Sequence, residues 1–470
     1  MSQGFGRCGF GVCAAAAFTL AACSWQQPSG APGAMPPAGF HRSSASQYLS
    51  HVIVIIQENR SFENFFAGYP GANAPLTGCA SPPPGKARAI RRLTTSACPP
   101  GDQLVALHQD TFKNNPDLQH NWTSSMVDWN KGQMDGFTKY GTKNGQYEAY
   151  DYIDRADIQP YWTMAQQYVL ADEMFPTEFG GSFTGHLTLI AGTDDIKLPN
   201  QAEVNFPSKA PDDCDAPPGT KSDYLTPNRH VHYTGPFPCF DQFNTIAQVL
   251  DGAGVSWKIY ATKVLDGGMW EPFEAIKYVR YGSDWTGNVV APQTTVLTDA
   301  QNGQLASVDW VTPSHADSDH PAYHGDAGPS WVASVVNAVG ESSYWPTSAI
   351  IVVWDDWGGF YDNAAPPQPD YRGLGIRVPC LIISPYAKQG YVSHVQYEYG
   401  SILRFIEEVY GIPAGSIGPT SKGYTDGRAA SLDDAFDFTQ SPRPFTPIGS
   451  KYPMSRYIHE PPSDEPVDNE

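Results

Sequence analysis

The sequence predicts an α/β fold, a three-layer α/β/α sandwich with a mostly parallel central sheet and long loop insertions. Two β-branched apolar runs, 51–57 and 349–354, have the length and composition of strands that are buried on both faces. Other strand-like runs alternate with helix-like segments along the chain, which is typical of a parallel sheet covered by helices. The 470 residues show no internal repeat and no second linker-like break, so we expect one large domain.

The spacing of apolar residues predicts the individual elements. The expected strands are 51–57, 168–172, 255–260, 349–354 and 378–384. The expected helices are 61–66, 156–167, 184–191, 242–252, 329–339 and 397–410. In the last helix, Ile402, Phe405 and Val409 fall on one face, and the segment stops at Gly411 with Pro413 beyond it.

Three stretches are longer than ordinary connections, namely 71–105, 196–240 and 260–325. Insertions of this length usually cover or shape a site. The formal net charge of −20, without a basic stripe, argues against a nucleic-acid partner. The 44 glycines and 42 prolines, with only 17% charged residues, indicate a loop-rich globular protein.

The N-terminus has the pattern of an export signal. Arg7 precedes an apolar stretch, 9–22, that is too short to span a bilayer but suits a signal-peptide core. Leu20-Ala-Ala-Cys23 resembles the bacterial lipoprotein cleavage box, in which the cysteine receives lipid. The alternative is an ordinary signal cut near the same small residues.

These features predict a boundary scheme and a location. We expect a signal peptide over 1–22, a flexible tether over 23–48, the folded domain over 49–445 and an acidic, Pro-rich tail over 446–470. The protein is expected to be exported, as a periplasmic or cell-envelope lipoprotein anchored through Cys23 or as a secreted protein. Membrane contact is expected only through that lipid anchor.

The remaining cysteines suit an oxidising compartment. Cys79 and Cys98 flank one Pro/Gly-rich loop and Cys214 and Cys239 another, so we pair them within each loop. Each bridge would close a loop of about twenty residues, worth roughly 3 kcal/mol by chain entropy. Cys380 lies in a strand-like run and is interpreted as a buried free thiol. The absence of Cys/His zinc spacing argues against a structural zinc.

Polar side chains follow both long apolar runs. Glu58 and Asn59 follow the first run, and Asp355 and Asp356 follow the second. The carboxyl ends of parallel strands meet at one edge of a sheet, where open α/β folds build their sites. Carboxylate and amide oxygens suit a divalent cation, so the four residues are candidate metal ligands. The alternative is that these acids only cap the helices that follow.

Ser182 is the candidate nucleophile. It follows Gly180-Gly181 and precedes a helical stretch, and a helix N-terminus favours a phosphate-like anion. Its hydroxyl would need activation, here by the metal. The alternative is that Ser182 only caps the helix. Position 184 is Thr, so the segment is not the Gly-x-Ser-x-Gly elbow of α/β-hydrolases.

Three histidines are further candidates. His120 and His320 lie in loops dense with polar residues and could donate to a phosphoryl oxygen or protonate a leaving group. His186 lies four residues after Ser182 and can share a helix face with it.

Several motifs together resemble the bacterial phosphoesterase family that contains acid phosphatases and non-specific phospholipases C. The resemblance runs in collinear order from about residue 50 to 440. Its motifs are His51-Val-Ile-Val-Ile-Ile-Gln-Glu-Asn-Arg-Ser-Phe-Glu-Asn-Phe-Phe66, Gly132-Gln-Met-Asp-Gly-Phe137, Asp157-Ile-Gln-Pro-Tyr161, Ser318-Asp-His-Pro321, Asp355-Asp-Trp-Gly-Gly-Phe-Tyr-Asp362, Val378-Pro-Cys-Leu-Ile-Ile-Ser-Pro385 and Ser401-Ile-Leu-Arg-Phe-Ile406.

The resemblance implies an alkaline-phosphatase-like fold and a metal-dependent phosphoesterase. It implies that Glu58, Asn59, Asp355 and Asp356 hold the metal. It also implies that Ser182 attacks phosphorus to give a phosphoserine that water then hydrolyses. His120 and His320 match family histidines around the phosphoryl group. A phosphomonoesterase and a phospholipase C use this same core, so the substrate is a phosphate ester or a phospholipid.

Two segments depart from the family pattern. Many relatives read Gly-Pro-Ser/Thr followed by Pro-Asn-Arg where this chain has Gly180-Gly-Ser-Phe-Thr-Gly-His186, so His186 is a candidate replacement for a phosphate contact. Many relatives also carry Asp-Glu-His where this chain has Asp355-Asp-Trp357. Two alternative functions stay open: a catalytically inactive surface lipoprotein that binds phosphate-bearing ligands, and a metal-free serine esterase that uses Ser182 with a histidine.

Overall fold

A nine-stranded sheet forms the centre of the protein. The computed structural model describes residues 45–81, 98–142, 147–197, 200–263 and 270–463. The sheet order is β11 (Val289–Val290), β10 (Trp257–Tyr260), β12 (Val308–Val311), β1 (His51–Gln57), β13 (Ser348–Trp354), β14 (Val378–Ile383), β6 (Val169–Phe175) and β15 (Tyr391–Ser393), with β16 (Tyr397–Glu398) also paired to β6.

The sheet is mostly parallel, as expected. The pairings of β1 with β12 and β13, of β10 with β11 and β12, and of β6 with β15 and β16 are all parallel. Strand β14 runs antiparallel to both of its neighbours, β13 and β6. The near-continuous β-branched composition of β1 and β13 fits this centre, because both of their faces are covered by helices.

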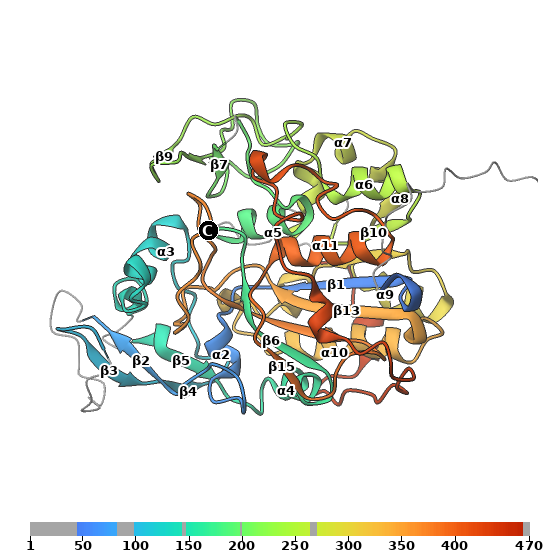
Figure 1. Ribbon diagram of the computed structural model, residues 1–470, viewed down its shortest axis with the longest axis horizontal. Helices are drawn as coiled ribbons and strands as arrows, with labels where there is room; N and C mark the ends of the chain where they lie inside the picture. The colour runs from blue at the N-terminus through green and yellow to red at the C-terminus, as the bar shows by residue number, and fades with distance from the viewer. Residues whose placement is uncertain (1–44, 82–97, 143–146, 198–199, 264–269, 464–470) are drawn as a thin grey trace, which may run out of the picture. The chain divides into compact units, whose positions relative to one another are not determined.

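Helices cover both faces of the sheet, which confirms the three-layer α/β/α architecture (Figure 1). One layer contains α1 (Ala45–Tyr48), α5 (Ser182–Ala191), α6 (Ile246–Ala253) and α11 (Tyr399–Val409). The other contains α4 (Gln159–Gln167), α9 (Thr295–Asn302), α10 (Gly328–Gly340) and α12 (Met454–Ile458). The remaining α-helices are α2 (Phe62–Phe66), α3 (Trp122–Trp129), α7 (Lys277–Arg280) and α8 (Asp284–Asn288).

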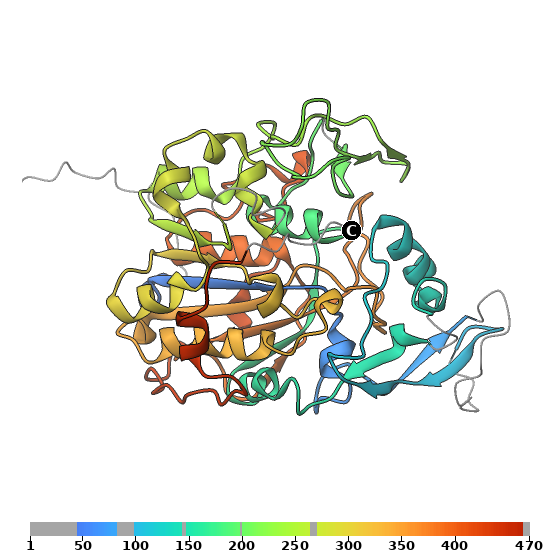
Figure 2. The same cartoon turned by 180° about the vertical axis from the view of Figure 1, so that it is seen from behind.

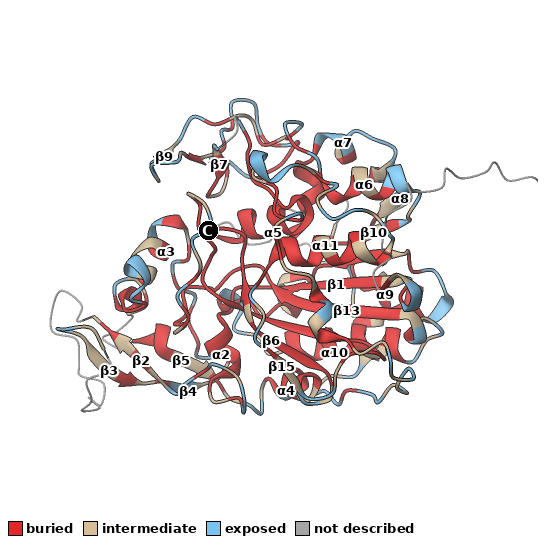
Figure 3. Ribbon diagram, in the orientation of Figure 1, coloured by how far each residue is buried: buried red, intermediate tan, exposed pale blue. Residues whose placement is uncertain are grey.

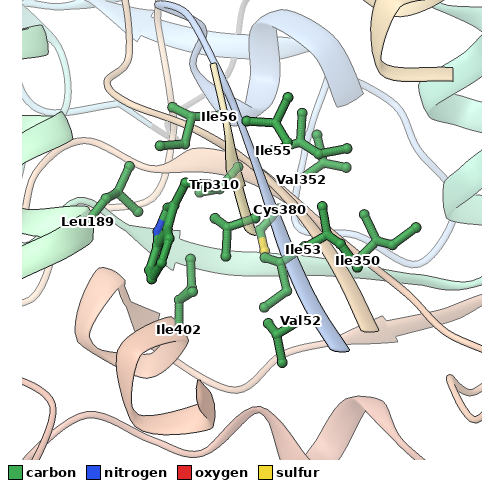
Figure 4. Close-up of a cluster of buried hydrophobic side chains, with 14 of the residues drawn as sticks. Val52, Ile53, Ile55, Ile56, Leu189, Trp310, Ile350, Val352, Cys380 and Ile402 are labelled. Atoms are coloured by element: carbon green, nitrogen blue, oxygen red, sulfur yellow. The ribbon is translucent and has the colours of Figure 1, made fainter. Parts of the chain in front are cut away.

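Side chains of the sheet and of the first helical layer pack into one continuous core. Leu189 of α5 and Ile402 of α11 lie beside Trp310 of β12, next to the side chains of β1 (Figure 4). All three are fully buried, and the burial of the sheet contrasts with the more exposed outer loops (Figure 3). The apolar face predicted for 397–410 is this inner face of α11.

The long insertions form small sheets of their own. Strands β2 (Thr77–Ala80) and β3 (Gln103–Ala106) pair antiparallel, and β4 (His108–Asp110) pairs with β5 (Asp151–Ile153). Together with α3 they lie beyond the carboxyl end of β1 in both views (Figure 2). Strands β7 (Ala202–Glu203), β8 (Tyr224–Leu225) and β9 (Val231–His232) form a third small sheet.

The structure confirms the cysteine pairings. Disulfides join Cys79 to Cys98 and Cys214 to Cys239, and Cys380 is a buried free thiol. The predicted signal peptide, the lipidation candidate Cys23 and most of the predicted tether lie outside the described residues. Within the described ranges, no helix is both long and apolar enough to cross a membrane.

Strand β12, helices α3 and α9, and the end of the packed region all differ from expectation. Strand β12 was not expected, because Asp309 interrupts its short apolar run. The packed region also continues past the expected boundary at residue 445, since Ile448 and Tyr457 are buried and Tyr457 packs on Trp331 of α10. Apolar side chains in this otherwise polar segment hold α12 against the domain.

Candidate active site

Parallel pairing brings the two polar strand ends together. In the register of β1 and β13, Gln57 lies opposite Trp354, so Glu58 and Asp355 leave the sheet side by side. The backbone N–H of Asp355 donates to the carbonyl of Gln57 at 3.0 Å. The N–H of Asn59 in turn donates to Oδ1 of Asp355 at 2.9 Å. All of these residues are fully buried, as expected for a site at this edge of the sheet.

A close backbone approach locks the second strand end onto the first. Asn59 has a left-handed φ of 57°, and Gly358 has a φ of 62°. A Cβ on Gly358 would lie 2.1 Å from the carbonyl oxygen of Asn59, so the turn after Asp356 requires glycine there. Within this turn, Oδ1 of Asp356 accepts the N–H of Gly358 at 2.7 Å, which fixes its carboxylate.

Ser182 is the first helical residue of α5, and its hydroxyl faces Asp356. Its Oγ donates to Oδ2 of Asp356 at 3.0 Å and lies 3.4 Å from the side-chain amide of Asn59. The N-cap of α5 is Gly181, and Ser182 is 1% exposed. The hydroxyl therefore does not cap the helix; it is directed at a carboxylate that follows β13.

Asn59 connects the strand ends to both predicted histidines. Its hydrogen bonds are satisfied when the amide oxygen accepts from Nε2 of His120 at 2.7 Å and of His320 at 3.0 Å. The amide nitrogen then donates to Glu58 at 3.2 Å and to Asp355 at 3.1 Å. Nδ1 of His320 accepts the N–H of Ala322 at 3.1 Å, which leaves the ring proton on Nε2.

His186 lies against the carboxylates. Its Nε2 is 3.0 Å from Oε1 of Glu58 and 3.8 Å from Oδ2 of Asp355. Burial lowers the pKa of His186 to about 4, against the opposing effect of Asp355, so the ring is neutral at pH 7. Ligand atoms of Glu58, His186 and Asp355 all lie within 4.8 Å of one another, and all three residues are buried. The sequence placed His186 near Ser182 but did not predict this grouping.

A pocket of about 600 Å³ opens beside Gly181 and Phe183, the two neighbours of Ser182 in the chain. His120, Gly181 and Phe183 line it, together with Phe206 and Tyr233 from the insertion over 196–240. Its carboxylates are Asp117 and Asp223, and burial raises the pKa of Asp223. The insertion over 196–240 was expected to shape a site, and its residues Phe206 and Tyr233 do line this pocket.

Trp357 directly follows Asp356 and packs against one of the candidate histidines. Its indole ring meets the His120 ring edge-on, with centroids 6.1 Å apart at 83°. Its Nε1 donates to Oδ2 of Asp128 at 3.4 Å, and both residues are 1% exposed. Asp128 and Arg60 were not predicted as part of the site; a charged residue inside an otherwise buried motif was the signal available for Arg60.

Comparisons with known proteins show which family this chain resembles over most of its length. The model of the Phosphoesterase family matches residues 49–413. The chain is 25% identical over 449 residues to phospholipase C B of Mycobacterium tuberculosis, covering 85% of this chain and 80% of that protein. It is 24% identical over 456 residues to the non-hemolytic phospholipase C of Pseudomonas aeruginosa, covering 87% of this chain and 60% of that protein.

A more distant likeness exists among solved structures. A protein in the alkaline phosphatase superfamily from Vibrio parahaemolyticus aligns with a TM-score of 0.33 at 14% identity, covering 55% of this chain and 62% of that one. The fold assignment rests instead on the sheet and its two helical layers. The family match spans most of the chain and includes Glu58, Ser182, Asp355 and Asp356, so the chain belongs to the phosphoesterase family and is a phosphoric ester hydrolase.

Proposed function

We propose that this protein hydrolyses phosphate monoesters or phospholipid-type phosphodiesters, with Ser182 as the nucleophile and a divalent metal ion at the neighbouring acidic cluster. The observation that carries the proposal is the 3.0 Å hydrogen bond from the buried Ser182 hydroxyl to the Asp356 carboxylate. It supports the proposal because it holds the Ser182 hydroxyl beside a carboxylate that could accept its proton, at the N-terminus of α5, where a phosphate group would be stabilised. Relatives named phospholipase C support the phospholipid alternative.

The cluster suits a divalent cation. Glu58 and Asp355 are buried carboxylates beside a neutral imidazole, a donor set used by divalent transition metals. Burying two carboxylates costs free energy unless a cation offsets their charge. We assign Glu58, His186 and Asp355 to the ion, and Asn59 and Asp356 to the side of the site that faces Ser182. When bound, the ion would offset the negative charge of the substrate phosphate and the negative charge that develops on its oxygens during the reaction.

The remaining groups supply attack and proton transfer. Asp356 orients Oγ of Ser182 and accepts its proton as Oγ bonds to phosphorus and the bond from phosphorus to the leaving oxygen breaks. His320 carries a proton on Nε2, and we assign it to donate a hydrogen bond to the leaving oxygen, which then takes up the proton held by Asp356. His120 is assigned to hold a phosphoryl oxygen. Asp356, again a carboxylate, then accepts a proton from water as the water oxygen bonds to phosphorus and the bond from phosphorus to Oγ breaks. That proton passes to Oγ, which regenerates the hydroxyl as the phosphate product leaves.

The site geometry disfavours a metal-free serine esterase. Such an enzyme needs a histidine hydrogen-bonded to its serine. Here the Ser182 hydroxyl donates to a carboxylate, and Nε2 of His120 is 3.9 Å from that same carboxylate. A catalytically inactive phosphate-binding lipoprotein is also disfavoured, because the nucleophile, its acceptor and the acidic cluster are all present.

The test compares wild type with Ser182→Ala on p-nitrophenyl phosphate and on phosphatidylcholine, each with EDTA and with divalent ions restored. We expect Ser182→Ala to lose activity by on the order of 10³-fold or more and to form no acid-stable phosphoprotein. Ser334→Ala, a buried serine on α10, is the matched control and should keep full activity. Unchanged activity in Ser182→Ala would exclude the nucleophile, and full activity in EDTA would exclude the metal.

A further inference from the structure

Arg60 lies next to Asn59 and is fully buried. Its Nε donates to the carbonyl oxygen of Asp319 at 2.8 Å. Its Nη1 donates to the side-chain oxygens of Asn115 and, at 3.1 Å, of Asn64. Its backbone N–H donates to the carbonyl oxygen of Asp356 at 3.0 Å. One residue thus bonds three segments that are far apart in sequence.

These bonds reach the segments that carry the two site histidines. Asp319 directly precedes His320, and Asn115 lies five residues before His120 on the same loop. The Asp319 carboxylate accepts from the Tyr161 hydroxyl at 2.7 Å and from the Trp354 indole at 3.1 Å. The segment before His320 is therefore fixed to the scaffold by the Asp319 side chain and to Arg60 by the Asp319 backbone.

The surroundings keep the guanidinium in a single orientation. Its central carbon lies 5.5 Å, 5.1 Å and 5.1 Å from the ring centroids of Phe65, Phe112 and Phe360. Burying a charged guanidinium costs free energy. An apolar side chain would fill the same space at a lower cost in free energy, so packing alone does not account for arginine here.

We propose that Arg60 is a positioning residue that fixes His120 and His320 relative to each other around Asn59. The planar fork of arginine can donate in two directions at once, toward Asp319 and toward Asn115, whereas the single ammonium of lysine cannot span both. Since the roles of the two histidines belong to the function proposed above, this proposal depends on it.

The first test is Arg60→Lys, with Arg377→Lys as the matched control. Arg377 is equally buried, bonds Asp362 and the Asp172 carbonyl, and packs 4.4 Å from the Phe62 ring, but touches neither histidine segment. We expect Arg60→Lys to lower kcat on p-nitrophenyl phosphate by on the order of 10²-fold with KM changed less than about threefold, since small misplacements of catalytic groups act on kcat. Arg377→Lys should lower Tm comparably but keep kcat within about threefold.

A double-mutant cycle separates positioning from general stability. If Arg60 acts through the histidines, Arg60→Lys should lower kcat by less than about threefold in a variant that already carries His120→Ala and His320→Ala. The proposal would be overturned if Arg60→Lys lowered kcat in that background by as large a factor as in wild type. It would also be overturned if Arg377→Lys lowered kcat as much as Arg60→Lys does. If Arg60→Lys fails to fold, Asn115→Ala takes its place, because it removes one acceptor of the guanidinium. Asn115→Ala should show part of the expected loss in kcat. A normal kcat in Asn115→Ala would also overturn the proposal.

The Ser182→Ala result keeps the two proposals apart. Suppose that Ser182→Ala is inactive but that Arg60→Lys lowers kcat as much in the double-histidine background as in wild type. That result would exclude only the positioning role of Arg60. An active Ser182→Ala would remove the proposed function itself, whatever Arg60 does.

Discussion

Asn59 determines how the polar residues around Ser182 are divided. Its left-handed backbone directs the amide between Glu58 and Asp355 on one side and His120 and His320 on the other. A side chain that could not both donate and accept would leave buried polar atoms unsatisfied, at about 1–3 kcal/mol each. The asparagine therefore separates a carboxylate side, suited to a cation, from a histidine side, suited to a phosphoryl group.

At the same scale, His186 tests the metal assignment. Wild-type protein stripped of metal should gain thermal stability when divalent ions are added, because binding to the folded state adds about 2.7 kcal/mol at a hundredfold excess over Kd. His186→Gln should lose most of this gain, since it removes one of the three grouped ligands. Thermal unfolding with Mn²⁺, Zn²⁺, Mg²⁺ and Ca²⁺ is the measurement.

The control for that experiment is His459→Gln, at an exposed position, which should respond to metal as wild type does. An absent shift in wild type with every ion, or an undiminished shift in His186→Gln, would contradict the assignment.

At the scale of elements, α5 brings Ser182 to Asp356 because it packs directly on the end of β13. A Cβ on Gly185 would lie 2.3 Å from the carbonyl oxygen of Asp355 and 3.0 Å from its carbon. Backbone atoms cannot yield as a flexible side chain can. Glycine at this position thus sets the distance between Ser182 and Asp356.

Gly185→Ala should therefore displace α5 and break the contact between Ser182 and Asp356. We expect kcat to fall by on the order of tenfold or more and the free energy of unfolding to fall by about 1–3 kcal/mol, despite the better helix propensity of alanine. Kinetics and urea unfolding measure the two effects.

Gly252→Ala is the matched helical control, because a Cβ placed there would meet no atom within 4 Å beyond its chain neighbours and the nearby backbone of its own helix. It should raise the free energy of unfolding by about 0.5–1 kcal/mol and leave kcat unchanged. Wild-type kcat in Gly185→Ala would show that α5 can shift without harm.

At the scale of the whole molecule, the central sheet encloses a carboxyl group far from the site. Asp309 of β12 is fully buried, and burial raises its pKa to about 7, with the Ala306 N–H and Lys258 acting in the opposite direction. The folded state therefore binds this proton more tightly than the unfolded state. The resulting stability is fully present below about pH 4 and is lost as pH rises through about 7.

Asp309→Asn should abolish this pH dependence, because the amide is neutral throughout. Relative to wild type, the free energy of unfolding of the variant should rise by about 4 kcal/mol between pH 4 and pH 8, since each pKa unit corresponds to about 1.4 kcal/mol. Urea unfolding across this range measures it. Asp241→Asn, at a side chain that is 57% exposed, should show no such trend, and parallel curves for Asp309→Asn and wild type would refute the prediction.

The sequence by itself determined the sheet centre and which polar residues meet at its edge. The runs 51–57 and 349–354 have the length and composition of buried strands, and parallel strands bring Glu58-Asn59 and Asp355-Asp356 to one edge of the sheet. The disulfide pairs followed from short loop closure. These predictions held because each depends on local composition or on a general rule of strand pairing.

Only the tertiary structure decided how the site is divided. The contact of His186 with Glu58 joins residues 128 positions apart, and the bonds of Arg60 to Asp319 and Asn115 join segments 259 and 55 positions apart. The antiparallel direction of β14 and the presence of strand β12 also became visible only in the tertiary structure. Such contacts depend on how closely packed backbones can approach, as at Gly185 and Gly358, and no periodicity along the chain encodes that distance.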